Sequence, residues 1–292
     1  MSYLVDEIAS QPESWSEAIK LAPSADQALP RPGEQVAAVG CGSSLNVARC
    51  YGTLREAAGH GKTDAFPASE VTATRRYDCV LYISRTGTTT EVLESLRQVP
   101  AGTSTVAVTT DPDAPLAREA GRVVLLDFAG ERSVVSSRFI TSSIVLLRAH
   151  LGADVSGLPA VAARELARPL PPELSGKSEF TFLGRGWAAA VADEAALKLR
   201  EASRTWAESY PAMEYRHGPI SVSDAGTVVW ALGEVPADLL ADARRTGATV
   251  IASDADPLAG LIGAQRLAAA LAERKGIDPD QPRALSRSVI LA

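Results

Sequence analysis

The chain has 292 residues, of which 46% are hydrophobic and 22% are charged, a composition typical of globular proteins. Its length favours two domains over one and allows each a sizeable core. The net charge is −6 and no block of Lys or Arg stands out, which argues against the basic surface that nucleic acid requires. We therefore expect no nucleic-acid partner, and a bound phosphate would be held mainly by dipoles and hydroxyls.

Targeting and metal-binding signals are missing from the sequence. The N-terminal stretch MSYLVDEIASQPESW has acidic residues and no long apolar core, so we expect no signal peptide. No run of about 18 apolar residues is present, so we expect no membrane span. Three cysteines without a CxxC pair and three histidines without an HExxH motif predict neither a disulfide framework nor a metal site. These features predict a cytoplasmic protein without a metal or other cofactor.

The first half of the chain alternates strand and helix patterns. Residues 35–39, 79–83, 104–109 and 123–126 read as short buried strands. The first ends at Gly40-Cys41-Gly42 before a helical pattern that opens near Ser44, and the second passes into a helix over residues 90–97. Strands that alternate with helices and end in glycine turns indicate a parallel sheet covered on both faces.

The second half repeats this pattern after a proline-rich stretch. Residues 158–177 contain four prolines and predict a short helix followed by a linker. The strand at residues 180–183 then runs into Gly184-Arg185-Gly186, which matches Gly40-Cys41-Gly42, and residues 228–232 and 248–252 match later strands of the first half. We expect two similar α/β domains, at residues 1–157 and 173–292.

Two strand ends in the first domain are rich in hydroxyls. Ser43 and Ser44 follow the first strand, and Ser84, Thr86 and Thr89 surround Gly87 after the second. Serine and threonine donors, glycine turns and helix N-termini together suit a phosphate dianion, and Arg85 could add a charged contact. The alternative is that these residues are ordinary helix caps and loop residues. The matching corner at residues 232–236 has no hydroxyl, so we expect one phosphate site per chain.

Five motifs in this order support a family resemblance: GCGSS, ISRTGTTTE, EAALKLREAS, EYRHGP and DPDQPRALSRSV. The chain resembles the sugar isomerase (SIS) family, and above all the isomerase half of the glucosamine-6-phosphate synthases. The resemblance covers almost the whole chain, from about residue 12 onward. It implies an α/β fold of tandem SIS domains, each a five-stranded parallel sheet flanked by helices.

The resemblance also implies roles for individual residues. The sugar phosphate, of a hexose or a hexosamine 6-phosphate, would be bound by Ser43, Ser44, Ser84, Thr86 and Thr89. The sugar pocket would be lined by Val134, Val135, Ser136 and Ser137. Glu201 matches the carboxylate that moves a proton between C1 and C2, with Glu194 and Lys198 as supporting residues on the same helix. His217 matches the histidine that assists ring opening in the neighbouring subunit, which implies a homodimer with shared active sites.

The spacing of the acidic and basic residues is compatible with these roles. Glu194, Lys198 and Glu201 stand at i, i+4 and i+7 and so share one helix face. A carboxylate beside a lysine can stay ionised and can both take and return a proton. The alternative is a salt-bridged surface helix, and the alternative for His217 is a purely structural histidine.

Two departures from the family pattern bear on function. The chain carries no amidotransferase domain with an N-terminal cysteine, so we expect it not to be a complete synthase. Arg287 stands before Ser288-Val289, where the family has an imine-forming lysine, and a guanidinium, which stays protonated in proteins, is a poor nucleophile. Arg287 could remain as an electrostatic partner of the open-chain hydroxyls.

The loss of that lysine favours a substrate that brings its own nitrogen. The leading hypothesis is therefore a glucosamine-6-phosphate deaminase or isomerase. A fructosamine-6-phosphate deglycase, an amine-free aldose–ketose isomerase and a non-catalytic phosphosugar sensor stay open as alternatives.

Overall fold

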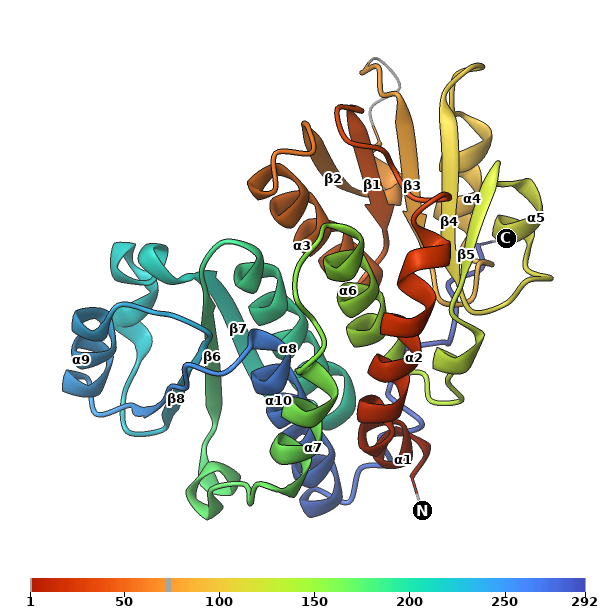
Figure 1. Cartoon of the computed structure of the whole chain (residues 1–292). Helices are drawn as coiled ribbons and strands as arrows, with labels where there is room; N and C mark the ends of the chain where they lie inside the picture. Colours follow the sequence, from red (N-terminus) through yellow and green to blue (C-terminus); the bar gives the residue numbers. More distant parts are fainter. Residues whose placement is uncertain (1, 72–74, 292) are drawn as a thin grey trace. The chain divides into compact units, whose positions relative to one another are not determined.

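The computed structural model describes residues 2–71 and 75–291, which divide into two compact units (Figure 1). We call Ser10–Gly157 together with residues 285–291 the first unit, and residues 2–9 together with Leu158–Ala284 the second unit. The change of unit follows Gly157, and each terminal segment packs within the unit formed by the other half of the chain.

The first unit is built on a parallel sheet of five strands in the order β2-β1-β3-β4-β5. The strands are β1 (Val36–Gly40), β2 (Thr63–Pro67), β3 (Cys79–Ile83), β4 (Ser104–Thr109) and β5 (Arg122–Leu125). Every residue of β1 and β3 is buried, as expected for central strands of a parallel sheet covered on both faces.

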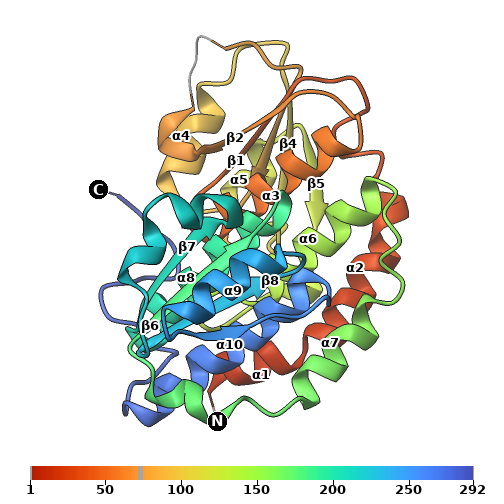
Figure 2. The ribbon, with the colours of Figure 1, turned by 90° about the vertical axis from the view of Figure 1, so that its left-hand side faces the viewer.

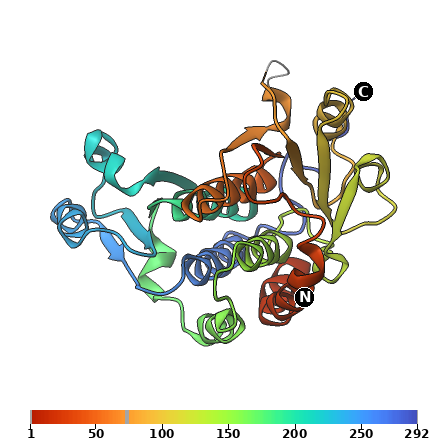
Figure 3. The same ribbon diagram turned by 45° about the horizontal axis from the view of Figure 1, so that its top comes forward.

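Helices complete the first unit. They are α2 (Gln11–Ala25), α3 (Ser43–Ala57), α4 (Thr90–Arg97), α5 (Pro115–Glu119) and α6 (Arg138–His150), with 3₁₀ turns at η1 (Ala68–Glu70) and η2 (Asp127–Ala129). Helices α2 and α6 lie side by side (Figure 3), and the buried Trp15 indole donates a 2.8 Å hydrogen bond to the Thr141 hydroxyl between them. This bond satisfies two polar groups that would be costly to bury alone.

The second unit carries a parallel sheet with the strand order β7-β6-β8-β9. Its strands are β6 (Glu179–Gly184), β7 (Trp206–Pro211), β8 (Thr227–Leu232) and β9 (Thr249–Ile251). Its helices are α1 (Tyr3–Ala9), α7 (Leu158–Ala167), α8 (Trp187–Ser203), α9 (Ala237–Arg245) and α10 (Pro257–Arg274), with 3₁₀ turns at η3 (Pro172–Gly176), η4 (Ala212–His217) and η5 (Pro219–Val222).

The expectation of five strands in the second sheet is wrong, since the described residues form four there. In the first unit, β4 is followed by the 5-residue helix α5 and then by β5. In the second unit, β9 leads into the 18-residue helix α10, whose Ala- and Leu-rich face is buried against α8 (Figure 2). No strand of the second sheet follows β9 among the described residues.

The two units share the same turn between the first strand and its helix. A Cβ at Gly40 would lie 2.5 Å from the Ser44 carbonyl carbon, and one at Gly184 would lie 2.1 Å from the Ala188 carbonyl oxygen. Gly42 and Gly186 have φ values of 54° and 56°, a region that glycine adopts without a Cβ penalty. Both GxG motifs therefore need glycine for the same two reasons: the first glycine has no room for a Cβ, and the second has a positive φ.

Among residues 2–71 and 75–291, no helix combines the length and apolar character needed to cross a bilayer.

Candidate active site

The first hydroxyl-rich corner lies at the carboxyl end of β1, where ligands gather in parallel α/β sheets. The tight Gly40–Gly42 turn leads directly into α3, so Ser43 and Ser44 stand in the first turn of a 15-residue helix. Ser44 is buried and Ser43 is half-buried. The free N–H groups and dipole of such a helix end favour an anion.

The second corner lies at the carboxyl end of the neighbouring strand β3. The buried Ser84 hydroxyl accepts a 3.2 Å hydrogen bond from the Gly87 amide, which closes the turn before α4. Gly87 has a φ of 62°, and a Cβ there would lie 2.6 Å from the Ala114 Cβ. The turn presents three half-buried hydroxyls, which we call the hydroxyl cluster: Thr86, Thr88 and Thr89.

The C-terminal segment (residues 286–291) lies on the hydroxyl cluster, within the same unit. The Ser288 Oγ lies 2.9 Å from Thr88 Oγ1, 3.3 Å from Thr86 Oγ1 and 3.3 Å from Thr89 Oγ1. The Thr90 amide at the start of α4 donates to the Val289 carbonyl over 3.1 Å. Sequence reasoning missed Ser288, because nothing in a single serine signals a contact some 200 residues away.

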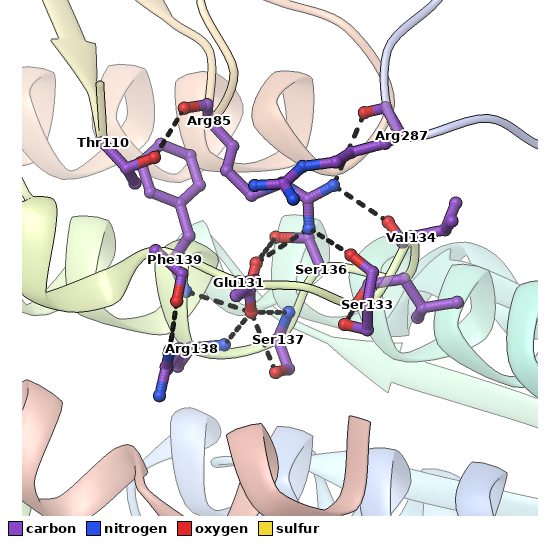
Figure 4. Close-up of polar contacts among 12 residues, drawn as sticks. Arg85, Thr110, Glu131, Ser133, Val134, Ser136, Ser137, Arg138, Phe139 and Arg287 are labelled. Carbon is purple, nitrogen blue, oxygen red and sulfur yellow. Dashed lines mark hydrogen bonds and ion pairs between the residues drawn. The ribbon is translucent and has the colours of Figure 1, made fainter. Parts of the chain in front are cut away.

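Arg85, for which a charged contact to the phosphate was expected, is engaged by neighbouring groups of the first unit. Its guanidinium pairs with the buried Glu131 at 3.0 Å and donates to the carbonyls of Ser133 and Val134, each over 3.1 Å (Figure 4). It also reaches the Arg287 carbonyl at 3.5 Å. The side chain is 8% exposed, and these acceptors make Arg85 a structural clamp of this loop.

Glu131 organises the loop that precedes α6. One of its oxygens accepts from the backbone amides of Ser137 and Arg138 at 2.6 and 2.7 Å, and the other accepts from the Ser136 hydroxyl at 2.7 Å (Figure 4). Burial raises the pKa of the Glu131 carboxyl, but Arg85 and these donors outweigh it and hold that pKa below its usual value. An ionised carboxylate thus stabilises the N-terminus of α6.

The four residues predicted to line the sugar pocket belong to the loop that Glu131 and Arg85 hold. The Ser136 and Ser137 hydroxyls both donate to Glu131, and the Val135 side chain is buried. Val134 is half-buried and its carbonyl accepts from Arg85. The structure therefore uses the side chains of this loop to fix its backbone.

In the second unit, α8 carries the predicted acid–base group. Lys198 Nζ lies 3.2 Å from a Glu194 carboxylate oxygen and 2.6 Å from a Glu201 carboxylate oxygen. The side chains of Glu194 and Lys198 are 1% and 2% exposed, whereas Glu201 is 20% exposed. Burial lowers the pKa of Lys198, but the two carboxylates outweigh it and raise that pKa above its usual value. Glu201 is thus the member of the triad that solvent reaches.

The expected alternative of a solvated surface helix does not describe α8, since Glu194 and Lys198 are buried. Lys275 caps the C-terminal end of α10, and its side chain reaches the C-terminal end of α8, where it donates to the Ser203 carbonyl at 3.0 Å and to Thr205 Oγ1 at 2.6 Å. Partial burial lowers the pKa of Lys275. A cation at this position is favourable to the helix dipole.

His217 is exposed at the end of η4. Its neighbour Arg216 is paired with Asp238 at 2.9 Å and with Asp242 at 2.6 Å, and these pairs anchor the turn. The turn leaves through Gly218 at a φ of 139°. The backbone of this turn is thus anchored, while the His217 imidazole is exposed.

Two cavities lie away from these groups. One of about 940 Å³ is lined by Gln35, Asp78 and Thr103, among others, at the amino ends of β1, β3 and β4, which is the wrong edge for ligands of a parallel sheet. The other, of about 440 Å³, lies at the carboxyl edge of the second sheet and is lined by Glu234, Asp254 and Asp256. Arg185 also lines this cavity, which therefore holds three acids and one base.

Comparison with known proteins finds similarity to curated aminotransferases and to solved structures. No family model matches it. A glutamine–fructose-6-phosphate aminotransferase (isomerizing) from Sulfolobus acidocaldarius is 30% identical over 87% of this chain and 50% of its own length. The chain spans about half the length of the curated relatives that it matches. It is therefore homologous to part of these aminotransferases, in agreement with the five motifs.

Solved structures support the fold. Glucosamine-6-phosphate deaminase from Thermotoga maritima has a TM-score of 0.81 and 27% identity, covering 99% of this chain and 100% of that one. The C-terminal domain of the Francisella tularensis glucosamine-fructose-6-phosphate aminotransferase has a TM-score of 0.82 and 24% identity, covering 97% and 98%. The chain thus has the fold of these proteins over almost its entire length.

Proposed function

We propose that this protein is a phosphosugar isomerase-type enzyme that acts on an aminosugar phosphate, with glucosamine 6-phosphate as the first candidate. The similarity to a glucosamine-6-phosphate deaminase over 99% of the chain carries this proposal. The homology to isomerizing aminotransferases and the buried triad on α8 support it. The protein would work as a homodimer without a metal or other cofactor.

The phosphate would bind at the two hydroxyl-rich corners of the first unit. Ser43 and Ser44 begin α3, and Ser84 with Thr86 and Thr89 shape the turn before α4. Hydroxyls and two helix N-termini can hold a dianion without a general positive field. The backbone of residues 134–137, fixed by Glu131, would contact the sugar.

Proton transfer would fall to Glu201. It is the triad carboxylate that solvent reaches, and the Lys198 ammonium lies 2.6 Å from one of its oxygens. Glu201 would take the proton from C2 of the open-chain aminosugar and return it to C1. His217 of the partner subunit would assist ring opening.

Arg287 decides which substrates fit this chemistry. Its guanidinium is exposed and is too basic to form an imine with a ketose. A 2-amino sugar supplies its own nitrogen, since moving the proton from C2 to C1 leaves an imine at C2. Water then hydrolyses that imine to a ketose phosphate and ammonia.

The experiment is to incubate the protein with glucosamine 6-phosphate and to measure ammonia and fructose 6-phosphate together. Glu201→Gln should lower turnover by about 10²- to 10⁴-fold while sugar-phosphate binding persists. Glu173→Gln is the matched control, because it makes the same substitution at an exposed glutamate on η3. Equal turnover in wild type and Glu201→Gln would remove Glu201 from the reaction.

A second candidate is a sensor that binds the sugar phosphate without turnover, and Arg287 in place of a nucleophilic lysine favours it. Binding of glucosamine 6-phosphate with no ammonia release by the wild-type protein would select this alternative. Release of an amino acid from a fructosamine 6-phosphate would instead select the deglycase.

A further inference from the structure

The carboxylate proposed to transfer the proton lies in the last turn of its helix. Glu201 stands just before Ser203, where α8 ends. The last carbonyls of a helix have no partner within it, and helix ends fray unless other groups bind them. A group that transfers a proton must be held in place, since a misplacement of about 1 Å can cost about 10²-fold in rate. The proposed reaction therefore requires a fixed end of α8.

The backbone at this helix end has an unfavourable conformation. Arg204 follows α8 with φ 51° and ψ 35°, in the left-handed region. Glycine is the usual residue at such a position, because a Cβ makes this conformation costly. The Arg204 and Thr205 amides nevertheless donate to the Arg200 and Leu199 carbonyls over 3.2 and 3.3 Å. Further contacts must hold this turn closed.

Lys275 supplies such contacts from the end of another helix. Helix α10 packs against α8 (Figure 2), and Lys275 is the residue at which α10 ends. Its ammonium donates to the Ser203 carbonyl at 3.0 Å and to Thr205 Oγ1 at 2.6 Å. Ser203 and Thr205 are 0% and 5% exposed. One lysine thus satisfies two buried oxygens, on either side of the left-handed Arg204.

A chain of hydrogen bonds leads from this ammonium back into α8. An ammonium only donates and a carbonyl only accepts, so Thr205 Oγ1 accepts from Lys275, and the Ser203 hydroxyl donates to the Leu199 carbonyl at 2.7 Å. The Thr205 hydroxyl must therefore donate to Ser203 Oγ, which lies 2.7 Å away. The bonds all run in one direction, an arrangement in which each strengthens the next. The chain ends inside the turn that carries Glu201.

We propose that Lys275 is a positioning residue for Glu201: its ammonium locks the last turn of α8 through Ser203 and Thr205, and so fixes the backbone that presents the carboxylate. This inference rests on the proposed function, because it concerns the acid–base group of that reaction. Lys198 holds the Glu201 side chain at 2.6 Å, and Lys275 holds the helix end to which that side chain is attached. The two lysines act on different parts of the same residue.

The test measures kcat and KM for glucosamine 6-phosphate in variants of the full chain. Lys275→Met keeps an unbranched side chain but removes its donors, and should lower kcat about tenfold through misplacement of Glu201. KM should change by less than about twofold, because the lost interaction serves the transition state. Lys275→Arg keeps a donor for the Ser203 carbonyl and should recover most of the lost kcat.

Two further variants show whether the contact with α8 is responsible. Arg274 precedes Lys275 in the last turn of α10, and its guanidinium donates to Ser175 Oγ on η3 at 2.6 Å. Arg274→Met should therefore leave kcat and KM unchanged. Thr205→Val breaks the same chain of hydrogen bonds without removing a charge, and should lower kcat by less than Lys275→Met does. A normal kcat in both Lys275→Met and Thr205→Val would overturn the proposal.

A double variant separates positioning from a general contribution to the fold. Once Glu201→Gln has removed the carboxylate, Lys275→Met should not lower the residual turnover further, because the two changes act through one group. The residual rate is measured at high enzyme concentration. If Lys275→Met lowers turnover by the same factor in both backgrounds, its role is merely structural and the proposal is wrong.

The outcomes separate this inference from the proposed function. Wild-type turnover that Lys275→Met leaves unchanged would overturn the positioning role alone, and the enzyme assignment would stand. A higher KM at constant kcat would also overturn it, because Lys275 would then serve substrate binding. If the wild-type protein releases no ammonia from glucosamine 6-phosphate, both proposals fail.

Discussion

The Lys198 ammonium lies 2.6 Å from a carboxylate oxygen of Glu201, one turn away on α8. Glu194 completes the group from the other side at 3.2 Å. Two carboxylates thus share one buried cation, and Glu201 alone retains exposure. Lys198 therefore neutralises two carboxylates within the protein, and substitutions can test how much this stabilises the fold in the absence of a substrate.

Lys198→Met should destabilise the protein by about 3–5 kcal/mol, because it leaves buried carboxylates without their cation. Urea unfolding followed by circular dichroism would measure the loss. Lys20→Met is the control, since the Lys20 side chain is 70% exposed in its pair with Glu17 and such pairs contribute little. Equal loss in the two variants would contradict a structural role for Lys198.

The dependence of stability on alkaline pH also tests the role of Lys198. The pKa of Lys198 is raised above its usual 10.5, so its contribution to stability is complete below that value and is lost as pH rises through the folded-state pKa. Wild type should therefore lose more unfolding free energy than Lys198→Met above pH 10.5. Parallel curves for the two proteins would count against the raised pKa.

Glu131→Gln should also cost about 3–5 kcal/mol at neutral pH, because Arg85 is left buried without a counter-charge. The double variant Arg85→Gln with Glu131→Gln should recover part of that loss, since it removes both charges. Thermal unfolding of the two single variants and the double variant gives the coupling energy. Additive losses would show that the pair is not coupled.

Acid unfolding tests the lowered pKa of Glu131. The usual value is 4.5 and the folded-state pKa lies below it, so the stabilisation is present above pH 4.5 and is lost as pH falls through the folded-state pKa. Wild type should lose more stability than Glu131→Gln between neutral pH and that acid range. A steeper loss in Glu131→Gln would contradict this prediction.

Gly40→Ala should disrupt the turn that leads into α3, because the new Cβ would lie 2.5 Å from the Ser44 carbonyl carbon. We expect a loss of about 3 kcal/mol or more, as for other overpacked or strained backbone positions. Gly157→Ala, with no atom within 4 Å of the added Cβ, should be close to neutral. Similar melting temperatures for the two variants would refute the steric requirement.

Mixing two inactive variants tests the proposed role of His217 in the partner subunit. In a homodimer with shared sites, equal amounts of Glu201→Gln and His217→Asn should recover about a quarter of wild-type turnover, since half the dimers are mixed and each has one intact site. His217→Asn should fold normally, because His217 is exposed. No recovery after confirmed subunit exchange would place both residues in the site of one chain.

Much of the fold could be predicted from the sequence. Apolar runs that end in turn-forming residues identify β3 and β4 at the bounds seen in the structure, with a glycine turn after β3 and Asp111-Pro112-Asp113 after β4, and the helix predicted at residues 90–97 is α4. The edge strands β2 and β7 were not predicted. Both are mostly half-buried and end in proline, so they lack the apolar run of a central strand and the alternation of a one-sided one.

The sequence by itself determined the hydroxyl-rich corners, the repeated glycine turn and the shared face of Glu194, Lys198 and Glu201, because each depends on residues close together in the chain. Only the tertiary structure decided that Arg85 clamps Glu131, 46 residues away, and that Ser288 enters the hydroxyl cluster. These contacts join groups that no local pattern relates. Packing of the sheet and helices buries these polar atoms together, and buried polar atoms pair with one another because an unpaired one is costly.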